Sequence, residues 1–183
     1  MKKNKLNVLD LAYIGAFAAL MAVCSWISIP TTVPFTLQTL GVFLAISLLG
    51  WKRGFLSVLV YILLGMVGFP VFSGFKGGLG AIIGTTGGYI VGFLLTALVS
   101  GLIMDKFGKK IPVMMIAMLL GLIACYALGT VWFMYVYAQK TGPIGLMTTL
   151  GWCVFPFILP DCIKLALAIL IEKRAGDSIN SIL

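Results

Sequence analysis

The chain has 183 residues, of which 61% are hydrophobic and only 10% are charged. Globular proteins in water carry about 25% charged residues, so this composition excludes a soluble fold, which could not bury so much apolar surface. The composition therefore predicts an integral membrane protein.

The formal net charge is +8, but the positive residues lie between apolar runs, which indicates membrane topology rather than nucleic-acid binding. The chain has no histidine and five acidic residues, which argues against a metal site and against histidine-dependent catalysis. Its four cysteines lie in apolar stretches without a C-x-x-C spacing, so we interpret them as small apolar side chains. No cofactor is expected in the chain itself.

The apolar runs are continuous rather than alternating, which favours membrane-spanning helices over barrel strands. The first run, 11–29, is long enough to cross about 30 Å of hydrocarbon and ends at Pro30. The second run, 37–50, is short for a crossing and is expected to be tilted or partly interfacial. It closes with Trp-Lys-Arg at 51–53, and a third run covers 54–69.

The fourth run covers 81–104, and the fifth, 112–138, begins with a proline, which is favourable in the first turn of a helix. A loop is predicted over 139–151, and the sixth run, 152–171, is broken near its start by two prolines. The sequence thus predicts an all-α membrane protein with six transmembrane helices. No internal repeat or long linker divides it, so a single domain is expected over 1–183.

Six crossings place both termini on the same side of the membrane, and the basic residues indicate which side. Lys76 and Lys140 fall on the opposite side, and Lys164 lies inside the sixth run. By the positive-inside rule, both termini are predicted to be cytoplasmic, which puts Asp161 and Lys164 in the outer half of the sixth helix. The residues on the side of the termini are Lys2, Lys3, Lys5, Lys52, Arg53, Lys106, Lys109, Lys110, Lys173 and Arg174.

Asp161 and Lys164 stand out because a charged residue near the centre of a spanning helix costs about 2.5–3.5 kcal/mol. Three residues apart, they share one helix face and could simply neutralise each other. Alternatively, they line an outward-facing polar pocket, in which Asp161 accepts hydrogen bonds and Lys164 attracts an anionic or carbonyl group. Both interpretations are open from sequence alone.

Three further segments carry polar or flexible residues near the predicted outer side. The glycine-rich segment 73–80 lacks the Lys-Ser/Thr ending of a Walker A motif and suits either a flexible lid or a tight connection. The segment 84–89 suits close helix packing or a pocket wall, where Tyr89 could stack on a ligand. The polar groups at 36–39, which include Gln38, suit a helix cap or a ligand contact.

Small residues recur at a spacing of four in the first run. Such faces let helices approach closely, either within the bundle or against another subunit, and composition alone does not choose between these. The pairs are Ala12 with Ala16, Gly15 with Ala19, and Ala18 with Ala22.

Four motifs, spread in order over nearly the whole chain, carry a family resemblance. They read Val-Pro-Phe-Thr-Leu-Gln-Thr-Leu-Gly-Val at 33–42, Leu-Gly-Met-Val-Gly-Phe-Pro-Val-Phe at 64–72, Gly-Thr-Thr-Gly-Gly-Tyr at 84–89 and Pro-Asp-Cys-Ile-Lys at 160–164. Together they resemble the BioY family, the biotin-binding S components of energy-coupling factor (ECF) transporters. The first motif is highly specific, and the third departs from the family's usual Gly-Pro-Thr-Gly-Gly-Tyr at Thr85.

The resemblance implies a six-helix substrate-binding subunit in the cell membrane that captures biotin on the outer side. It also implies assembly with a transmembrane coupling protein and two cytoplasmic ATPases, so that ATP hydrolysis belongs to the partners and the chain is not an enzyme. Ala12 and Ala16 match the family's coupling face, and Asp161 and Lys164 match its ligand-contacting acid and base.

Biotin suits the pocket chemistry inferred from the residues. Its ureido N–H groups can donate to Asp161, and either its carbonyl or its carboxylate can accept from Lys164. Gln38, Phe35 and Tyr89 are further candidate contacts. The alternatives are an S component for another small vitamin, a membrane-embedded lipid-modifying enzyme and a purely structural subunit. The enzyme is disfavoured because the chain has only one acid deep in an apolar run.

Overall fold

The computed structural model describes residues 6–182, with side chains described for residues 6–176. Lys2, Lys3 and Lys5, on which the topology prediction partly depends, lie outside this range. The described chain is mostly helical, and five of its helical stretches are long and apolar enough to cross a membrane. These are α1 (Val8–Trp26), α2 (Gln38–Val67), α4 (Gly87–Phe107), α5 (Ile111–Lys140) and the stretch Leu146–Gly176.

Shorter elements connect the long helices. Two strands, β1 and β2, pair antiparallel between α1 and α2, with Ser28 opposite Thr36. The last apolar stretch consists of two helices, α6 and α7, separated at Val154. The bounds of these elements are β1 Ser28–Ile29, β2 Phe35–Thr36, η1 Ser73–Phe75, α3 Leu79–Ile82, α6 Leu146–Cys153 and α7 Phe155–Ile182.

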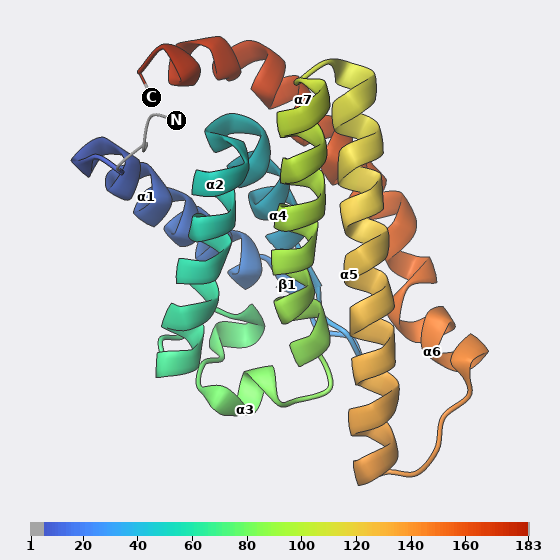
Figure 1. Ribbon diagram of the computed structural model, residues 1–183. Helices are drawn as coiled ribbons and strands as arrows, with labels where there is room; N and C mark the ends of the chain where they lie inside the picture. Colours follow the sequence, from blue (N-terminus) through green and yellow to red (C-terminus); the bar gives the residue numbers. More distant parts are fainter. Residues whose placement is uncertain (1–5, 183) are drawn as a thin grey trace.

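Helix α2 reverses its direction at Gly50, where the backbone adopts φ +78° and ψ 174°. A Cβ atom added to Gly54 would lie 2.8 Å from the carbonyl oxygen of Ala45 and 2.8 Å from the Cα of Ile46. In a continuous helix, residues 45 and 54 would be about 13 Å apart along the axis. The helix therefore folds back into two antiparallel legs, 38–49 and 51–67, which correspond to the second and third predicted runs (Figure 1).

The structure corrects three of the predicted boundaries. The fourth run is interrupted, because a non-helical segment at 83–86 separates α3 from α4. The loop prediction over 139–151 is wrong in its second half, which belongs to α6. Helix α7 contains Pro160 and continues to Ile182, well beyond the predicted end at 171.

The start of α1 is fixed by polar groups. The side chain of Asn7 accepts a hydrogen bond from the Asp10 N–H at 2.7 Å, and the Asp10 carboxylate accepts one from the Asn7 N–H at 2.9 Å. This reciprocal capping satisfies two backbone donors that a helix start leaves unpaired. Asp10 also pairs with the Arg53 guanidinium at 2.7 Å, which ties the start of α1 to the reversal of α2.

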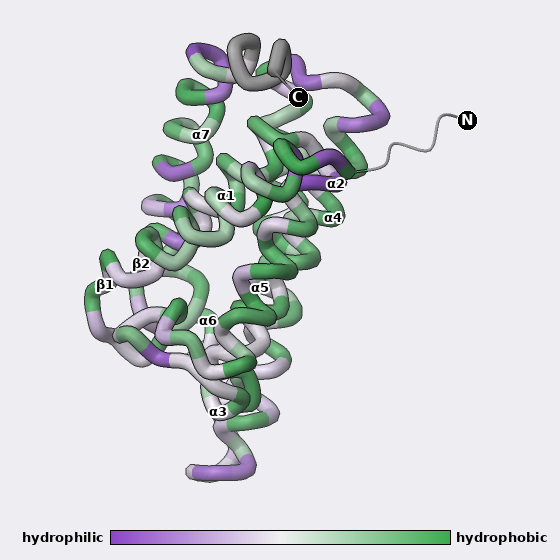
Figure 2. Tube along the Cα trace, turned by 90° about the vertical axis from the view of Figure 1, so that its left-hand side faces the viewer, coloured by the Kyte–Doolittle hydropathy of each residue, from purple (hydrophilic) through white to green (hydrophobic). Residues whose placement is uncertain are grey.

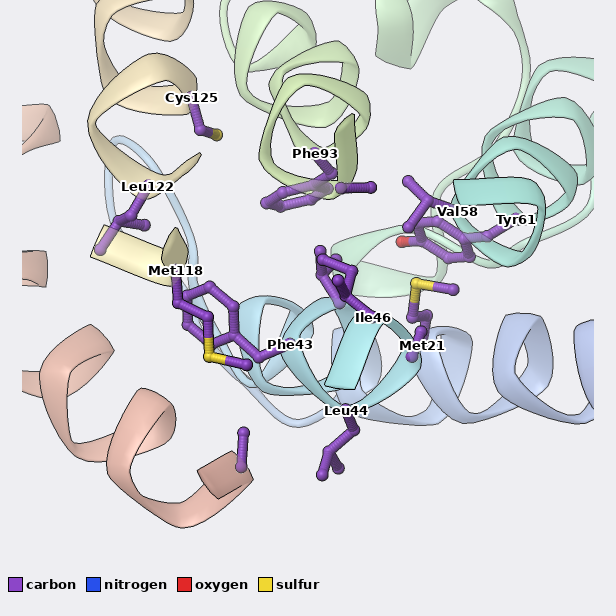
Figure 3. Packing of buried hydrophobic residues seen from close by; sticks show 14 of the residues in the cluster. Met21, Phe43, Leu44, Ile46, Val58, Tyr61, Phe93, Met118, Leu122 and Cys125 are labelled. Carbon is purple, nitrogen blue, oxygen red and sulfur yellow. The ribbon is translucent and has the colours of Figure 1, made fainter. Parts of the chain in front are cut away.

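Helix α2 is central to the packing, because it contacts α1, α4 and α7, while α4 packs extensively on α5. The core between these helices is apolar and tightly filled (Figure 3). Met21, Phe43, Val58 and Met118 are completely buried in it, and they come from α1, both legs of α2, and α5.

The bundle has two distinct ends (Figure 1). The lysine-rich end contains the start of α1, the reversal of α2, the turn between α4 and α5, and the end of α7. The loop end contains η1, α3 and the connection from α5 to α6. Hydrophilic residues gather toward both ends and hydrophobic residues dominate between them, as Figure 2 shows. This distribution is the one expected of a bundle that spans a membrane.

Candidate functional site

The two charged residues of the last apolar stretch form an ion pair on one face of α7. The Lys164 ammonium lies 2.7 Å from Oδ1 of Asp161, and both residues are buried, with exposures of 4% and 2%. Their spacing of three residues brings them together on the helix, as the sequence predicted. The net charge of the pair is zero, which lowers the cost of burying it in an apolar environment.

Asp161 also binds two hydroxyl groups from other helices. Thr39 of α2 donates to its Oδ1 at 2.8 Å, and Tyr126 of α5 donates to its Oδ2 at 2.5 Å. The carboxylate therefore joins α2, α5 and α7 in the interior of the bundle. Oδ2 has one partner from the protein and keeps the capacity to accept another hydrogen bond.

Lys164 has several partners besides the carboxylate of Asp161. Its ammonium group donates to the carbonyl oxygen of Thr36 at 2.6 Å and to Asp161. It also lies 4.6 Å from the centre of the Phe35 ring, within the range of a cation–π contact. The three N–H groups thus face two acceptors and one aromatic ring. Phe35 in turn stacks on Phe157 of α7, with 5.6 Å between the ring centres.

A deep cavity of about 60 Å³ borders the ion pair. Asp161, Lys164, Gln38 and Tyr89, four of the five predicted ligand contacts, line it. The fifth, Phe35, lies against Lys164 and is not among the lining residues. The full lining is Val33, Pro34, Thr36, Gln38, Thr39, Tyr89, Phe93, Cys125, Tyr126, Cys153, Phe157, Asp161 and Lys164.

Tyr89 is positioned by close contact between α4 and α5. A Cβ atom on Gly129 would lie 2.2 Å from the Tyr89 ring, so only a glycine at this position leaves room for the ring. The Tyr89 hydroxyl lies 3.3 Å from the hydroxyl of Thr130. The glycines of the 84–89 motif and of α5 therefore serve packing, and that packing places Tyr89 on the cavity wall.

A second, larger cavity of about 520 Å³ lies at the loop end of the bundle. It shares Val33, Pro34 and Gln38 with the deep cavity, so the two are adjacent. Its described lining is rich in hydroxyl groups and glycines and includes Lys76 and Lys140, with no acidic residue. This loop-end cavity is therefore electropositive, in contrast to the neutralised pair beside the deep cavity.

Sequence reasoning missed Tyr126, and it offered Thr39 only as part of a helix cap or a ligand contact, not as a partner of Asp161. Tyr126 lies well inside the fifth apolar run, away from the aromatic residues near its end. A tyrosine in the interior of a membrane helix needs a partner for its hydroxyl, and this was the signal available in the sequence. The partner itself depends on the packing of α5 against α7, which the sequence did not reveal.

The small residues of α1 fall on two different faces. Ala18 and Ala22 are buried against the bundle, with exposures of 2% and 6%. Ala12 and Ala16 are exposed on the opposite side of the helix, as is Ala19. Within this structure, the predicted coupling face is thus available to another subunit.

Comparisons with known proteins agree over nearly the whole chain. The model of the BioY family matches residues 1–181. The chain is 44% identical over 163 residues to the biotin transporter BioY of Thermotoga maritima, which covers 87% of this chain and 91% of that protein. It is 39% identical over 167 residues to the probable biotin transporter BioY of Pyrococcus horikoshii, covering 90% and 94% of the two chains.

A solved structure is also similar to the described fold. It is a crystal structure of the S-component for biotin from an ECF-type ABC transporter, with a TM-score of 0.82 and 30% sequence identity. The match covers 95% of this chain and 94% of that one. At this level of similarity the arrangement of the helices corresponds over nearly all of both chains.

Proposed function

This chain belongs to the BioY family, and from that premise we propose that Asp161 and its neighbours form the biotin site of an S component. The protein is the substrate-binding subunit for biotin uptake by an ECF-type transporter in the cell membrane. It works with a transmembrane coupling protein and ATPase subunits, and it is a transporter component rather than an enzyme.

The observation that carries the residue-level proposal is the deep cavity beside a buried, hydrogen-bonded carboxylate. A purely structural ion pair would have its remaining acceptor positions filled by hydrogen bonds from the protein. Here Oδ2 of Asp161 keeps an unused acceptor position and Asp161 lines the cavity. A ureido N–H is a donor that this position can accept from.

The hydrogen-bond inventory also favours one orientation of biotin. The charge of Lys164 is neutralised by Asp161, and its ammonium group already donates two hydrogen bonds, so it attracts a carboxylate less than an unpaired lysine would. Lys76 and Lys140 line the loop-end cavity, whose described lining has no acid. We therefore place the ureido ring toward Asp161 and the carboxylate of the valeryl chain toward these two lysines.

The sizes of the two cavities support the same orientation. The deep cavity, at about 60 Å³, has room for only a few water molecules. Biotin therefore has to extend into the adjoining loop-end cavity, past the shared residues Pro34 and Gln38. Tyr89 lies on the wall of the deep cavity, where it can cover the apolar bicyclic ring.

The proposed topology has six crossings with both termini in the cytoplasm. The reversal of α2 at Gly50 supports it, because each of its legs follows one predicted run. The described basic residues support it as well, since Lys52 and Lys110 belong to the lysine-rich end and Lys76 to the loop end. The loop-end cavity would then face the outside, where biotin arrives.

The experiment is a titration of the purified, folded protein with biotin by isothermal calorimetry. Submicromolar binding at one site per chain is expected, together with retained biotin in protein purified from biotin-containing medium. Thiamine and riboflavin serve as control vitamins, and neither should bind. Folded protein that does not bind biotin at submicromolar concentrations would overturn the proposal. Tight binding of a control vitamin would instead indicate an S component for that vitamin.

A further inference from the structure

A buried tyrosine outside the cavity lining connects the site to the rest of the molecule. Tyr61 lies in the second leg of α2 and is 1% exposed. Its hydroxyl accepts a hydrogen bond from Nε2 of Gln38 at 2.5 Å and donates to the carbonyl oxygen of Val71 at 3.1 Å. Tyr61 thus joins a residue of the cavity wall to the segment that follows α2.

The count of protons fixes the orientation of the Gln38 amide. A tyrosine hydroxyl has one proton, and Tyr61 uses it on the Val71 carbonyl, which can only accept. Gln38 must then present its NH₂ group to Tyr61. Its Oε1 is left to accept from the Thr36 hydroxyl, at 3.0 Å, on the cavity side. Without the Tyr61 hydroxyl, the amide loses this hydrogen bond and can rotate, which would replace its Oε1 acceptor with N–H donors beside the cavity.

The Val71 carbonyl is also held from α1. The Ser25 hydroxyl lies 2.5 Å from this oxygen and 2.7 Å from the carbonyl of Ala22, and its single proton serves one of the two at a time. Ser25 is fully buried at the last turn of α1. Gln38, Tyr61, Val71 and Ser25 therefore form one largely buried chain of polar contacts from the cavity to the end of α1.

The segment 69–77 has further anchors at the same place. The indole of Trp26 donates to the carbonyl of Pro70 at 2.8 Å, and its ring stacks on Phe75 at 5.2 Å between centres. Phe72 meets Tyr61 edge to face at 5.5 Å. This segment supplies Phe72, Ser73, Lys76 and Gly77 to the loop-end cavity. Defined hydrogen bonds and ring contacts therefore hold the segment 69–77 in place beside the site.

We propose that Tyr61 is a positioning residue that fixes the Gln38 amide for the ligand and couples occupation of the site to the seating of the segment 69–77. The proposal rests on biotin being the ligand, as proposed above. Coupling of this kind is reciprocal, so a ligand that holds Gln38 stabilises the seated segment to the same extent as the segment favours the ligand.

A double-mutant cycle on biotin affinity tests the first half. Tyr61→Phe keeps the ring contact with Phe72 and removes only the hydroxyl, and Gln38→Met removes the amide with little change in volume. Each is expected to weaken biotin binding about tenfold, while the double variant is no weaker than Gln38→Met alone. Additive losses, about a hundredfold in the double variant, would mean that Tyr61 does not act through Gln38.

Hydrogen exchange of the backbone amides in 69–77 tests the second half. In the wild-type protein, saturating biotin should slow the exchange of these amides. In Tyr61→Phe, saturating biotin should leave their exchange rate unchanged. Tyr135→Phe on the exposed surface of α5 is the matched control and should behave as wild type. Retained protection in Tyr61→Phe overturns the coupling.

The outcomes separate this inference from the proposed function. If the wild-type protein fails to bind biotin, the proposed function is wrong. If both single variants bind biotin normally, only the role of Tyr61 is contradicted, and the proposed function stands. If Tyr61→Phe does not fold, Gln38→Met probes the same link from the cavity side. In Gln38→Met, biotin should no longer protect the amides of 69–77 from exchange. Protection that persists in this variant would equally overturn the coupling.

Discussion

Asp161 holds together groups from three parts of the chain that are far apart in sequence. Its carboxylate accepts hydrogen bonds from Thr39, Tyr126 and Lys164. Charge-assisted hydrogen bonds of this kind are stronger than neutral ones, and leaving a buried charge unpaired is expensive. Asp161 therefore has a structural role and a proposed ligand-binding role at once, and a test must separate them.

Replacing Asp161→Asn should weaken biotin binding by at least about tenfold, ~1.4 kcal/mol. The carboxamide has half the acceptor capacity of the carboxylate and carries no charge. Calorimetry on folded protein measures the affinity. Because this change leaves Lys164 unpaired, the control is the double variant Asp161→Asn with Lys164→Met, which removes both charges. Wild-type affinity in the double variant would show that the pair is only structural.

The two lysines of the loop-end cavity give a prediction about the charge of the ligand. The double variant Lys76→Gln with Lys140→Gln should weaken biotin binding about fivefold, or ~1 kcal/mol, because two exposed charges each contribute modestly. The uncharged amide of biotin should bind the variant and the wild type equally well.

Calorimetry with both ligands measures this difference, and Lys110→Gln at the lysine-rich end is the matched control. An equal loss for biotin and its amide would contradict the proposed placement of the carboxylate.

At the level of elements, α1 has one face for the bundle and another that is open. Ala18 and Ala22 face inward against α2, whereas Ala12 and Ala16 are exposed. Small residues on an exposed face of a membrane helix allow another helix to approach closely. The end of the same helix holds Ser25, which contacts the segment beside the site. The helix that carries the proposed coupling face thus also contacts, through Ser25, the segment beside the proposed ligand site.

Ala12→Trp or Ala16→Trp should abolish assembly with the coupling protein and leave biotin binding unchanged. The indole would prevent close helix contact at the exposed face without entering the core. Co-purification with the tagged coupling protein measures assembly, and calorimetry measures binding. Ala127→Trp on an exposed position of α5 is the matched control. If the Ala12 and Ala16 variants co-purify normally with the coupling protein, the coupling protein does not bind at this face of α1.

Across the whole molecule, the two ends differ in charge and in shape. The lysine-rich end carries the described basic residues of two connections and of the end of α7, and the loop end carries the larger cavity. Helical bundles orient in membranes with their Lys- and Arg-rich connections in the cytoplasm. In the proposed topology, the loop-end cavity is the entrance for a ligand from outside.

Cysteine labelling in intact cells tests this orientation. In a variant whose four native cysteines are replaced by alanine, Lys76→Cys should react with a membrane-impermeant maleimide added outside. Lys110→Cys should react only after permeabilisation, and both positions are exposed in the folded chain. Labelling of Lys110→Cys but not Lys76→Cys in intact cells would invert the proposed topology.

Much of the site could be predicted from sequence because charge is so expensive in a membrane. Asp161 and Lys164 were identified by that cost alone, and their pairing followed from helical spacing. Tyr126 was not found, because a tyrosine in an apolar run is common and its partner lies on another helix. Phe35 was predicted only as a ligand contact, whereas in the structure it lies against Lys164 and is not among the residues that line the cavity.

The sequence by itself determined that the chain is a helical membrane protein of the BioY family, because hydrophobic runs, charge placement and motifs are local properties. The tertiary structure alone decided three other features. These are the reversal of α2 at Gly50, the convergence of Thr39 and Tyr126 on Asp161, and the contact chain through Tyr61. Each depends on contacts between residues that are distant along the chain, and such contacts are fixed only when the helices pack.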